Sequence, residues 1–123
     1  MRFEKVQKYP DAIIPTRSTE LAAGYDFYAA ENVLIPSYWD IMSKIREEFD
    51  SGLIFDDIIK KYPNLRPTLV STGVKIYLDS DKKLDIIPRS STPRKKWMIV
   101  ANSYGLIDAD YVDNLDNEGE IFV

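Results

Sequence analysis

The chain contains no cysteine and no histidine among its 123 residues. The absence of cysteine excludes disulfides, thiolate nucleophiles and Cys-ligated zinc or iron–sulfur centres. The absence of histidine removes the commonest metal ligand and the usual general base near neutral pH. Acid–base chemistry must therefore rest on Asp, Glu, Lys or Tyr, and a bound metal must be a hard, oxygen-bound cation such as Mg²⁺.

An excess of positive charge and long apolar runs are also absent. There are 16 basic and 20 acidic residues, which argues against broad binding to nucleic acid. No apolar run approaches the roughly 20 residues that cross a bilayer, and charges interrupt the apolar residues of the N-terminus, unlike a secretory signal. We therefore expect no nucleic-acid partner, no membrane contact and a cytoplasmic location.

The apolar residues that are present follow two different periods. They alternate with other residues over 27–35 and again from Leu69 onward, as in strands with one buried face. Between these parts they recur every three or four positions. This spacing predicts two helices, one over about 37–52 with Ser37 as N-cap and one over about 55–62 stopped by Pro63.

We expect a mainly β fold, a sandwich or barrel, with a helical hairpin inserted into it. The β core would comprise residues 1–36 and 67–123, and the helical insertion residues 37–66. Within the second part of the core, strands are predicted at 70–78, 84–87 and 97–100. A further strand begins at 120–123 with neither a turn nor a partner after it, so we expect a β core that is incomplete at its C-terminus.

Three short segments carry residues that do not serve packing. Gly24 and Asp26 begin a strand-like run, a pattern that also occurs in many ordinary turns. In the segment 88–92, a proline ends a strand and Arg89, Ser90 and Ser91 follow. The forked donors of Arg and the short hydroxyls of Ser suit phosphate oxygens, although the same residues can simply cap a short helix.

The third segment is residues 102–111. Gly105 in a tight hairpin lets the backbone approach a flat ligand closely. Asn102 offers both a donor and an acceptor, as the edge of a base requires. Asp108 follows two apolar residues, and a carboxylate held rigidly at that position could orient a water. Without a ligand, the same segment is an acidic, solvated turn between two strands.

Together and in this order, the three segments resemble the trimeric dUTP pyrophosphatases (dUTPases). The matching residues are AGYD at 23–26, PRSS at 88–91, and NSYGLIDADY at 102–111 followed by GEI at 119–121. The resemblance implies a jelly-roll or β-barrel core assembled as a homotrimer. It also implies hydrolysis of dUTP to dUMP and pyrophosphate, with Mg²⁺ bound to the triphosphate.

The resemblance gives each motif residue a role. Asp108 would orient and deprotonate the water that attacks the α-phosphorus, which suits a protein without histidine. The other residues would bind as follows: phosphate oxygens by Arg89, Ser90 and Ser91, Mg²⁺ by Asp26 through bound water, uracil by Asn102, Gly105, Leu106 and Ile107, the deoxyribose by Tyr111, and a further part of the nucleotide by Phe122.

The chain departs from the family pattern in three places. A Gly-x-Arg-x-x-Gln segment and a Gly-rich C-terminal arm are missing, from which we expect little turnover by this chain. The polar residues 112–117 are additional and should form a protruding, solvated loop. The helical hairpin, residues 37–66, has no basic face for DNA, so we expect it to pack or to bind a protein partner.

Two other functions stay open on the sequence. A dCTP deaminase of the same fold is favoured by residues 89–94, while the AGYD segment and the Asp108–Tyr111 hairpin favour hydrolysis. A non-catalytic, nucleotide-sensing or regulatory module is favoured by the missing C-terminal motifs and by the helical hairpin, which could bind a protein.

Overall fold

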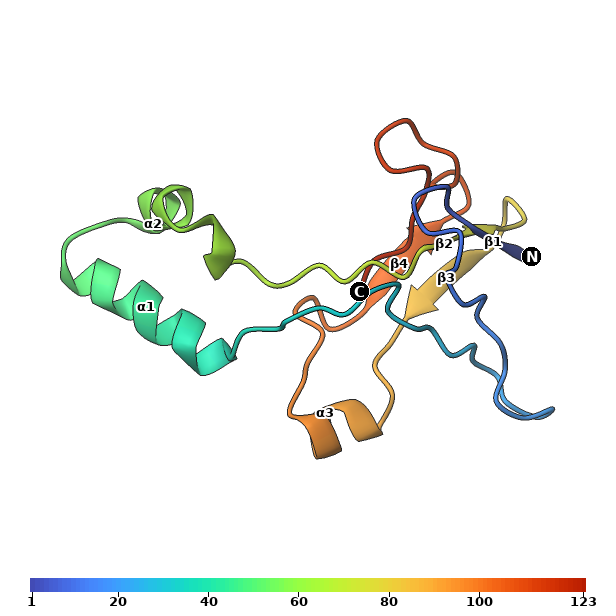
Figure 1. Ribbon diagram of the computed structural model, residues 1–123, viewed down its shortest axis with the longest axis horizontal. Helices are drawn as coiled ribbons and strands as arrows, with labels where there is room; N and C mark the ends of the chain where they lie inside the picture. Colours follow the sequence, from blue (N-terminus) through green and yellow to red (C-terminus); the bar gives the residue numbers. More distant parts are fainter. The chain divides into compact units, whose positions relative to one another are not determined.

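The computed structural model describes all 123 residues, and they form two compact units (Figure 1). The first, here called the β unit, joins Met1–Asn32 to Leu69–Val123. The second, here called the helical unit, is Val33–Thr68. None of the helices has the length and apolar character of a membrane span.

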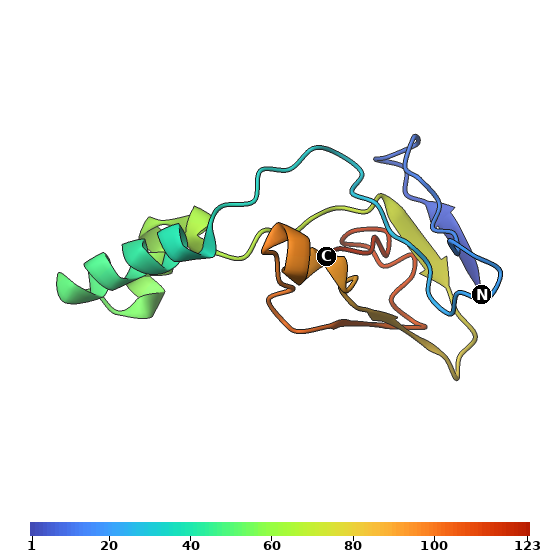
Figure 2. The same cartoon turned by 90° about the horizontal axis from the view of Figure 1, so that it is seen from below.

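The β unit contains four short strands in two antiparallel pairs (Figures 1 and 2). The strands and the helix between the last two are β1 (Arg2–Lys5), β2 (Val74–Tyr77), β3 (Lys83–Ile86), α3 (Ser91–Lys96) and β4 (Gly105–Asp108). β1 pairs with β2, and β3 pairs with β4. The result is two two-stranded sheets, and no closed sheet is formed.

The C-terminal residues pair with the segment that leads into β2. Val70 and Val123 exchange two backbone hydrogen bonds, of 2.8 and 3.0 Å, and Phe122 forms an isolated bridge with Ser71. The strand start predicted at 120–123 therefore has a partner, which an earlier part of the chain supplies. Periodicity along the sequence could not reveal this pairing, because it joins residues about fifty positions apart.

The core of the β unit gathers side chains from distant parts of the chain. Ile76 on β2, Ile86 on β3 and Ile121 near the C-terminus form the buried cluster, and Ile121 is fully inaccessible. Partly buried apolar side chains pack against it, namely Phe3, Phe27, Leu78, Leu84 and Ile107. Alternation along β3 and β4 therefore does identify the faces that turn inward.

Two of the predicted strands are wrong. Residues 27–35 form no strand, and the nearest pairing is a single bridge between Asp26 and Thr16. Residues 97–100 form none either, because Trp97 ends α3 in a left-handed conformation with φ 53° and is 93% exposed. A strand needs a continuous series of hydrogen bonds to a partner strand. The segment 27–35 makes a single such contact, from the Ala30 N–H to the Ser71 carbonyl at 2.8 Å, and 97–100 makes none to another strand.

The helical unit consists of three helical segments. They are α1 (Tyr38–Asp50), α2 (Phe55–Lys61) and the 3₁₀ helix η1 (Pro63–Leu65). The predicted helices are confirmed, with Ser37 at the N-cap position in extended backbone, although its side chain makes no capping bond. Ile45 on α1 and Ile58 on α2 are buried, as the amphipathic spacing requires.

Glu48 on α1 is the charged side chain buried within the helical unit. Its carboxylate accepts hydrogen bonds from the Tyr62 hydroxyl at 2.6 Å and from Lys61 Nζ at 3.1 Å, and Lys44 Nζ lies at 3.4 Å. These hydrogen bonds hold the pKa of Glu48 below its usual range. The bond from the Tyr62 hydroxyl has the largest effect, ahead of the lysines. The carboxylate thus joins α1 to the end of α2.

Candidate active site

A shallow, open cavity of about 390 Å³ lies at the C-terminal end of β4. Its lining is Leu106, Asp108, Asp110, Tyr111, Asn114, Asp116 and Asn117. Three of these, Leu106, Asp108 and Tyr111, are residues that the sequence singles out as site residues. The lining is rich in carboxylate and amide groups, so the cavity is suited to a polar ligand.

The strand period explains how β4 presents Asp108 to this cavity. Leu106 and Asp108 are two positions apart and are both exposed, while Ile107 between them packs against the core. β3 sets the register, because Asp108 lies opposite Lys83. The Asp108 carbonyl then accepts the Tyr111 N–H at 3.2 Å, which turns the chain immediately after the strand. Asp108 therefore stands at a rigid strand end.

Tyr111 is held at its hydroxyl and at its backbone. The hydroxyl donates to the Glu120 carbonyl at 3.1 Å and accepts from Asn117 Nδ2 at 2.8 Å. Asn114 Nδ2 donates to the Tyr111 carbonyl at 2.8 Å. The aromatic ring thus forms a wall of the cavity in a defined orientation.

The predicted phosphate-binding residues lie at the start of α3, outside this cavity. Ser90 occupies the N-cap position without a capping hydrogen bond from its side chain, and Ser91 is the first residue of the helix. Arg89 is mostly exposed, and its Nη1 atom lies 3.8 Å from Asp26 Oδ1. The structure thus brings the second sequence motif next to the first and leaves the Arg89 guanidinium accessible to an anion.

Asp26 is the predicted metal-associated residue, and it stands apart from other acidic groups. The chain contains no group of three or more acidic side chains that could hold a metal ion. A lone carboxylate does not form a complete protein site, but it fits Mg²⁺, which keeps several waters and takes its other ligands from substrate phosphates. The adjacent Arg89 brings a cationic, forked donor to within 3.8 Å of this carboxylate.

The remaining predicted residues lie around β4 and the C-terminus. Asn102 is exposed in the loop before β4, and its carbonyl accepts the Tyr104 N–H at 2.8 Å. Gly105 has an ordinary φ, and Ser103 carries the positive φ of this loop, at 68°. The left-handed backbone conformation expected at Gly105 therefore occurs at Ser103 instead. Gly105 packs close to Ile86.

An ion-pair network around the buried Lys75 was missed by the sequence reasoning. Lys75, on β2, is 7% exposed, and its Nζ donates to Asp113 at 2.5 Å and to Glu118 at 2.9 Å. The Tyr77 hydroxyl donates to the other Asp113 oxygen at 2.8 Å, and the Gln7 N–H donates to Glu118 at 3.0 Å. The prediction of a purely solvated loop at 112–117 is wrong for Asp113, which is tied to β2.

The network also displaces the pKa values of its members. The hydrogen bond from Lys75 is the main cause that lowers the pKa of Asp113, and the Gln7 N–H, followed by Lys75, lowers that of Glu118. The two carboxylates, Asp113 first, raise the pKa of Lys75. The only sign of this network in the sequence is a lysine between Val74 and Ile76, at the centre of a strand rich in β-branched residues.

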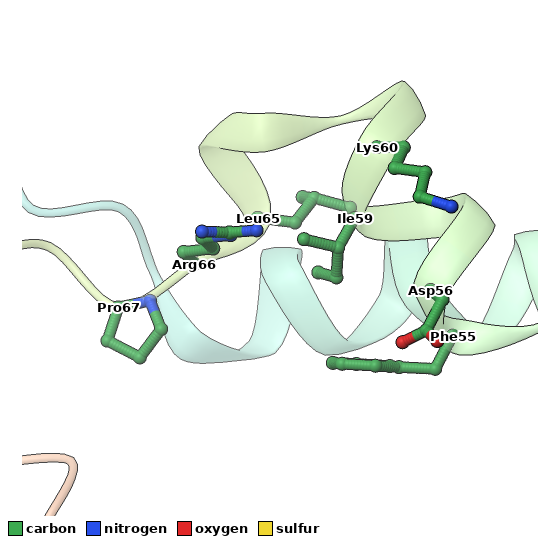
Figure 3. Close-up of a pocket in the computed structure, with 7 residues that line it drawn as sticks. All are labelled: Phe55, Asp56, Ile59, Lys60, Leu65, Arg66 and Pro67. Atoms are coloured by element: carbon green, nitrogen blue, oxygen red, sulfur yellow. The ribbon is translucent and has the colours of Figure 1, made fainter.

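The helical unit has a cavity of its own, of about 330 Å³ (Figure 3). Ile59 and Leu65 face each other at its centre, with the Phe55 ring beside them. Asp56, Lys60, Arg66 and Pro67 complete the lining. No residue singled out for nucleotide chemistry lies in it.

Comparison with proteins of known sequence finds relatives that are named as deoxyuridine 5′-triphosphate nucleotidohydrolases. It is 40% identical over 123 residues to the deoxyuridine 5′-triphosphate nucleotidohydrolase of Lactococcus lactis, covering 98% of this chain and 64% of that protein. It is 29% identical over 115 residues to the protein of that name from Heliobacterium modesticaldum, covering 94% and 64%. The chain thus spans less than two thirds of the length of these curated relatives. No family model matches it.

The structure leads to the same group. The crystal structure of dUTPase from Streptococcus mutans matches with a TM-score of 0.74 and 36% sequence identity, covering 100% of this chain and 76% of that one. The match thus extends over the β unit and the helical unit alike, and over all three motifs. Identity and backbone agree along the whole length, and the chain belongs to the dUTPase family.

Proposed function

We propose that the protein hydrolyses dUTP to dUMP and pyrophosphate, with Asp108 as the general base. The observation that carries this proposal is the presence of Asp108 and Tyr111 in one cavity at the end of β4. In the dUTPase pattern these positions belong to the base and to the residue under the sugar. The names of the relatives supply the substrate.

Asp108 acts on the water that attacks the nucleotide. The carboxylate accepts a proton from the water while the water oxygen bonds to the α-phosphorus. The bond from the α-phosphorus to the bridging oxygen breaks, and pyrophosphate departs with that oxygen. Such chemistry depends mainly on positioning and on neutralising charge, which a carboxylate at a rigid strand end can supply without histidine.

The triphosphate is proposed to bind between the start of α3 and Asp26. Arg89, Ser90 and Ser91 donate hydrogen bonds to phosphate oxygens, and the exposed guanidinium supports this role. Asp26 would hold Mg²⁺ through metal-bound waters, and the ion would supply neutralisation of phosphate charge. The proximity of Arg89 to Asp26 supports a common phosphate site for the two motifs.

Base and sugar selection are proposed for the residues around β4. Asn102 and the backbone of Gly105, Leu106 and Ile107 read the uracil edge, and a narrow hairpin rejects the thymine methyl group. Cytosine is rejected because buried donors and acceptors would be left without partners, which costs far more than a poor apolar fit. Tyr111 packs under the deoxyribose, and Phe122 contributes a further nucleotide contact.

A cytoplasmic homotrimer of jelly-roll subunits is proposed as the working form. Large apolar side chains of the β unit that are more than half exposed support burial against other copies, among them Leu69, Ile87 and Ile99. In this proposal residues 1–36 and 67–123 form the subunit core. Residues 37–66 are an insertion whose exposed aromatic residues, Tyr38 and Trp39, are available to a protein partner.

Calorimetry and a pyrophosphate-release assay test the function together. We expect the chain to bind a non-hydrolysable dUTP analogue more tightly with Mg²⁺, and to release pyrophosphate from dUTP at a low rate. Replacing Asp108 by Asn should lower the rate about 10²- to 10⁴-fold, the usual contribution of a positioned general base, and spare binding. The matched control is Asp85→Asn on β3, an exposed carboxylate paired only with Lys83.

The other outcomes identify the alternatives. Binding of the analogue without turnover in either protein would assign the chain to a nucleotide-sensing or regulatory role. Release of ammonia from dCTP would make it a deaminase. An Asp108→Asn protein as active as Asp85→Asn would overturn the role of Asp108.

A further inference from the structure

Backbone hydrogen bonds join the two ends of the loop between Tyr111 and Gly119. The Asp113 N–H donates to the Glu118 carbonyl at 3.1 Å, and the Glu118 N–H donates to the Asn114 carbonyl at 3.0 Å. Lys75 on β2 binds the carboxylates of both Asp113 and Glu118. The loop, residues 112–118, is therefore anchored to a buried strand and lies alongside the start of the chain (Figure 1).

Asn117, inside this loop, uses the two ends of its amide for different purposes. Its Oδ1 atom accepts the N–H of Gly119, the residue directly after the loop, at 3.0 Å. Its Nδ2 atom donates to the Tyr111 hydroxyl at 2.8 Å, a bond that leaves the loop and reaches the cavity wall. The donor end of Asn117 thus connects the anchored loop to the aromatic ring.

The Tyr111 hydroxyl needs this partner to have a single orientation. It donates to the carbonyl of Glu120, a buried residue next to Ile121 in the core. With the donor bond alone, the hydroxyl has one fixed contact, and the ring can pivot about it. The bond from Asn117 occupies the acceptor side of the same oxygen, so the ring is held from two directions.

We propose that Asn117 is a positioning residue that holds the Tyr111 ring still, and that the anchored loop thereby sets how strongly the site prefers a deoxyribose over a ribose. This inference rests on the proposed function. A ring held from two sides cannot move to make room for a 2′-hydroxyl, whereas a ring that pivots can.

The test is the isosteric replacement Asn117→Asp. The carboxylate keeps an acceptor for the Gly119 N–H and loses the donor to Tyr111. Calorimetry with dUMP and UMP gives the ratio of their dissociation constants. The two ligands carry the same charge, so the new carboxylate affects both alike and cancels in the ratio. We expect the preference for dUMP to fall about five- to tenfold, as for the loss of one net hydrogen bond of about 1 kcal/mol.

Two further variants complete the experiment. Asn64→Asp adds the same charge to the helical unit and should leave the preference unchanged. Tyr111→Phe removes the hydroxyl and should lower the preference as Asn117→Asp does, and adding Asn117→Asp to it should change nothing more. Additive losses would overturn the inference. So would a Tyr111→Phe protein that keeps its full preference, a result that can be obtained even where Asn117→Asp fails to fold.

The ring itself provides a measurement that does not depend on any nucleotide. The NMR signals of the Tyr111 ring, assigned by their absence from Tyr111→Phe, should shift and broaden in Asn117→Asp and stay unchanged in Asn64→Asp. Unchanged ring signals in Asn117→Asp would refute the positioning role. Equal binding of dUMP and UMP by the unaltered chain would instead refute the proposed function together with the sugar preference, so the two failures are distinguishable.

Discussion

The two units each bury a charged side chain, but they surround it with partners from very different distances along the sequence. In the helical unit the partners of Glu48 lie 13 and 14 positions away, at Lys61 and Tyr62. In the β unit the partners of Lys75 lie 38 and 43 positions away, at Asp113 and Glu118. The helical unit is therefore held by neighbours, whereas the β unit depends on the return of the chain's last residues to β2.

The largest expected difference between the units comes from their fully buried isoleucines. Ile121→Ala should destabilise the β unit by about 2–5 kcal/mol, because the cavity it leaves lies among side chains from three distant segments. Urea titration followed by the amide NMR signals of β2 and α1 would measure each unit separately. The matched change, Ile58→Ala, should instead lower the urea concentration at which the α1 signals report half unfolding. Equal effects of both variants on both units would remove the distinction.

Two glycines with positive φ provide the next comparison. A Cβ added to Gly73 would lie 2.6 Å from the Cβ of Ala12 and 2.8 Å from that of Tyr9. We expect Gly73→Ala to cost about 2–4 kcal/mol, from the clash and the left-handed backbone together.

Gly52 in the helical unit is the matched control for Gly73. Its φ is 98°, and no atom lies within 4 Å of an added Cβ, so Gly52→Ala should cost only the backbone term, about 1–2 kcal/mol. Thermal melting of both variants measures the difference. A Gly52→Ala protein as unstable as Gly73→Ala would show that crowding is not the cause.

Acid should weaken the β unit through its two paired carboxylates. Because the folded pKa values of Asp113 and Glu118 lie below their ordinary values of 3.8 and 4.5, their contribution is complete above those values and is lost as pH falls through the folded ones. The urea midpoint of β2 should therefore drop between pH 7 and pH 3. Lys75→Met removes the main cause of the lowered pKa of Asp113, so the fall of the β2 urea midpoint with pH should be clearly smaller in this variant. An unchanged drop would place the acid-sensitive groups elsewhere.

The smallest expected effect concerns acid and the helical unit. The pKa of Glu48 is also lowered, chiefly by the Tyr62 hydroxyl, so its contribution is likewise lost as pH falls below about 4.5. Tyr62→Phe should reduce the acid-induced fall in the urea midpoint of α1 and leave that of β2 unaltered. The lysines keep part of the effect, so a complete loss of acid sensitivity would contradict this account.

Sequence reasoning worked best where the relevant contacts are local. The helices at 37–52 and 55–62 were predicted close to their observed bounds, because the spacing of Ile45 and Ile58 on their own helices carries that information. It failed at 27–35, where apolar side chains alternate, and at the continuous apolar run 97–100, because neither segment pairs with a second strand. Alternation reports spacing and cannot show whether a partner exists.

The candidate site was predictable as a set of residues and not as an arrangement. The motifs alone indicated Asp108, Tyr111 and Arg89, and the structure groups Asp108 with Tyr111 and sets Arg89 beside Asp26. Asn117 was not identified as a site residue, because its role depends on a hydrogen bond to a tyrosine across a loop. No local pattern marks such a residue.

By itself, the sequence determined the chemistry that is open to this protein. Without histidine or cysteine, acid–base chemistry is limited to Asp, Glu, Lys or Tyr and metal binding to oxygen-bound cations, and the three motifs indicate the family. Only the tertiary structure decided which groups are held rigidly: Ile121 and Phe122 joined to the approach to β2, and Lys75 anchoring the loop that holds Tyr111. The physical reason is that these contacts close long stretches of chain, and their partners can be known only once the fold has brought them together.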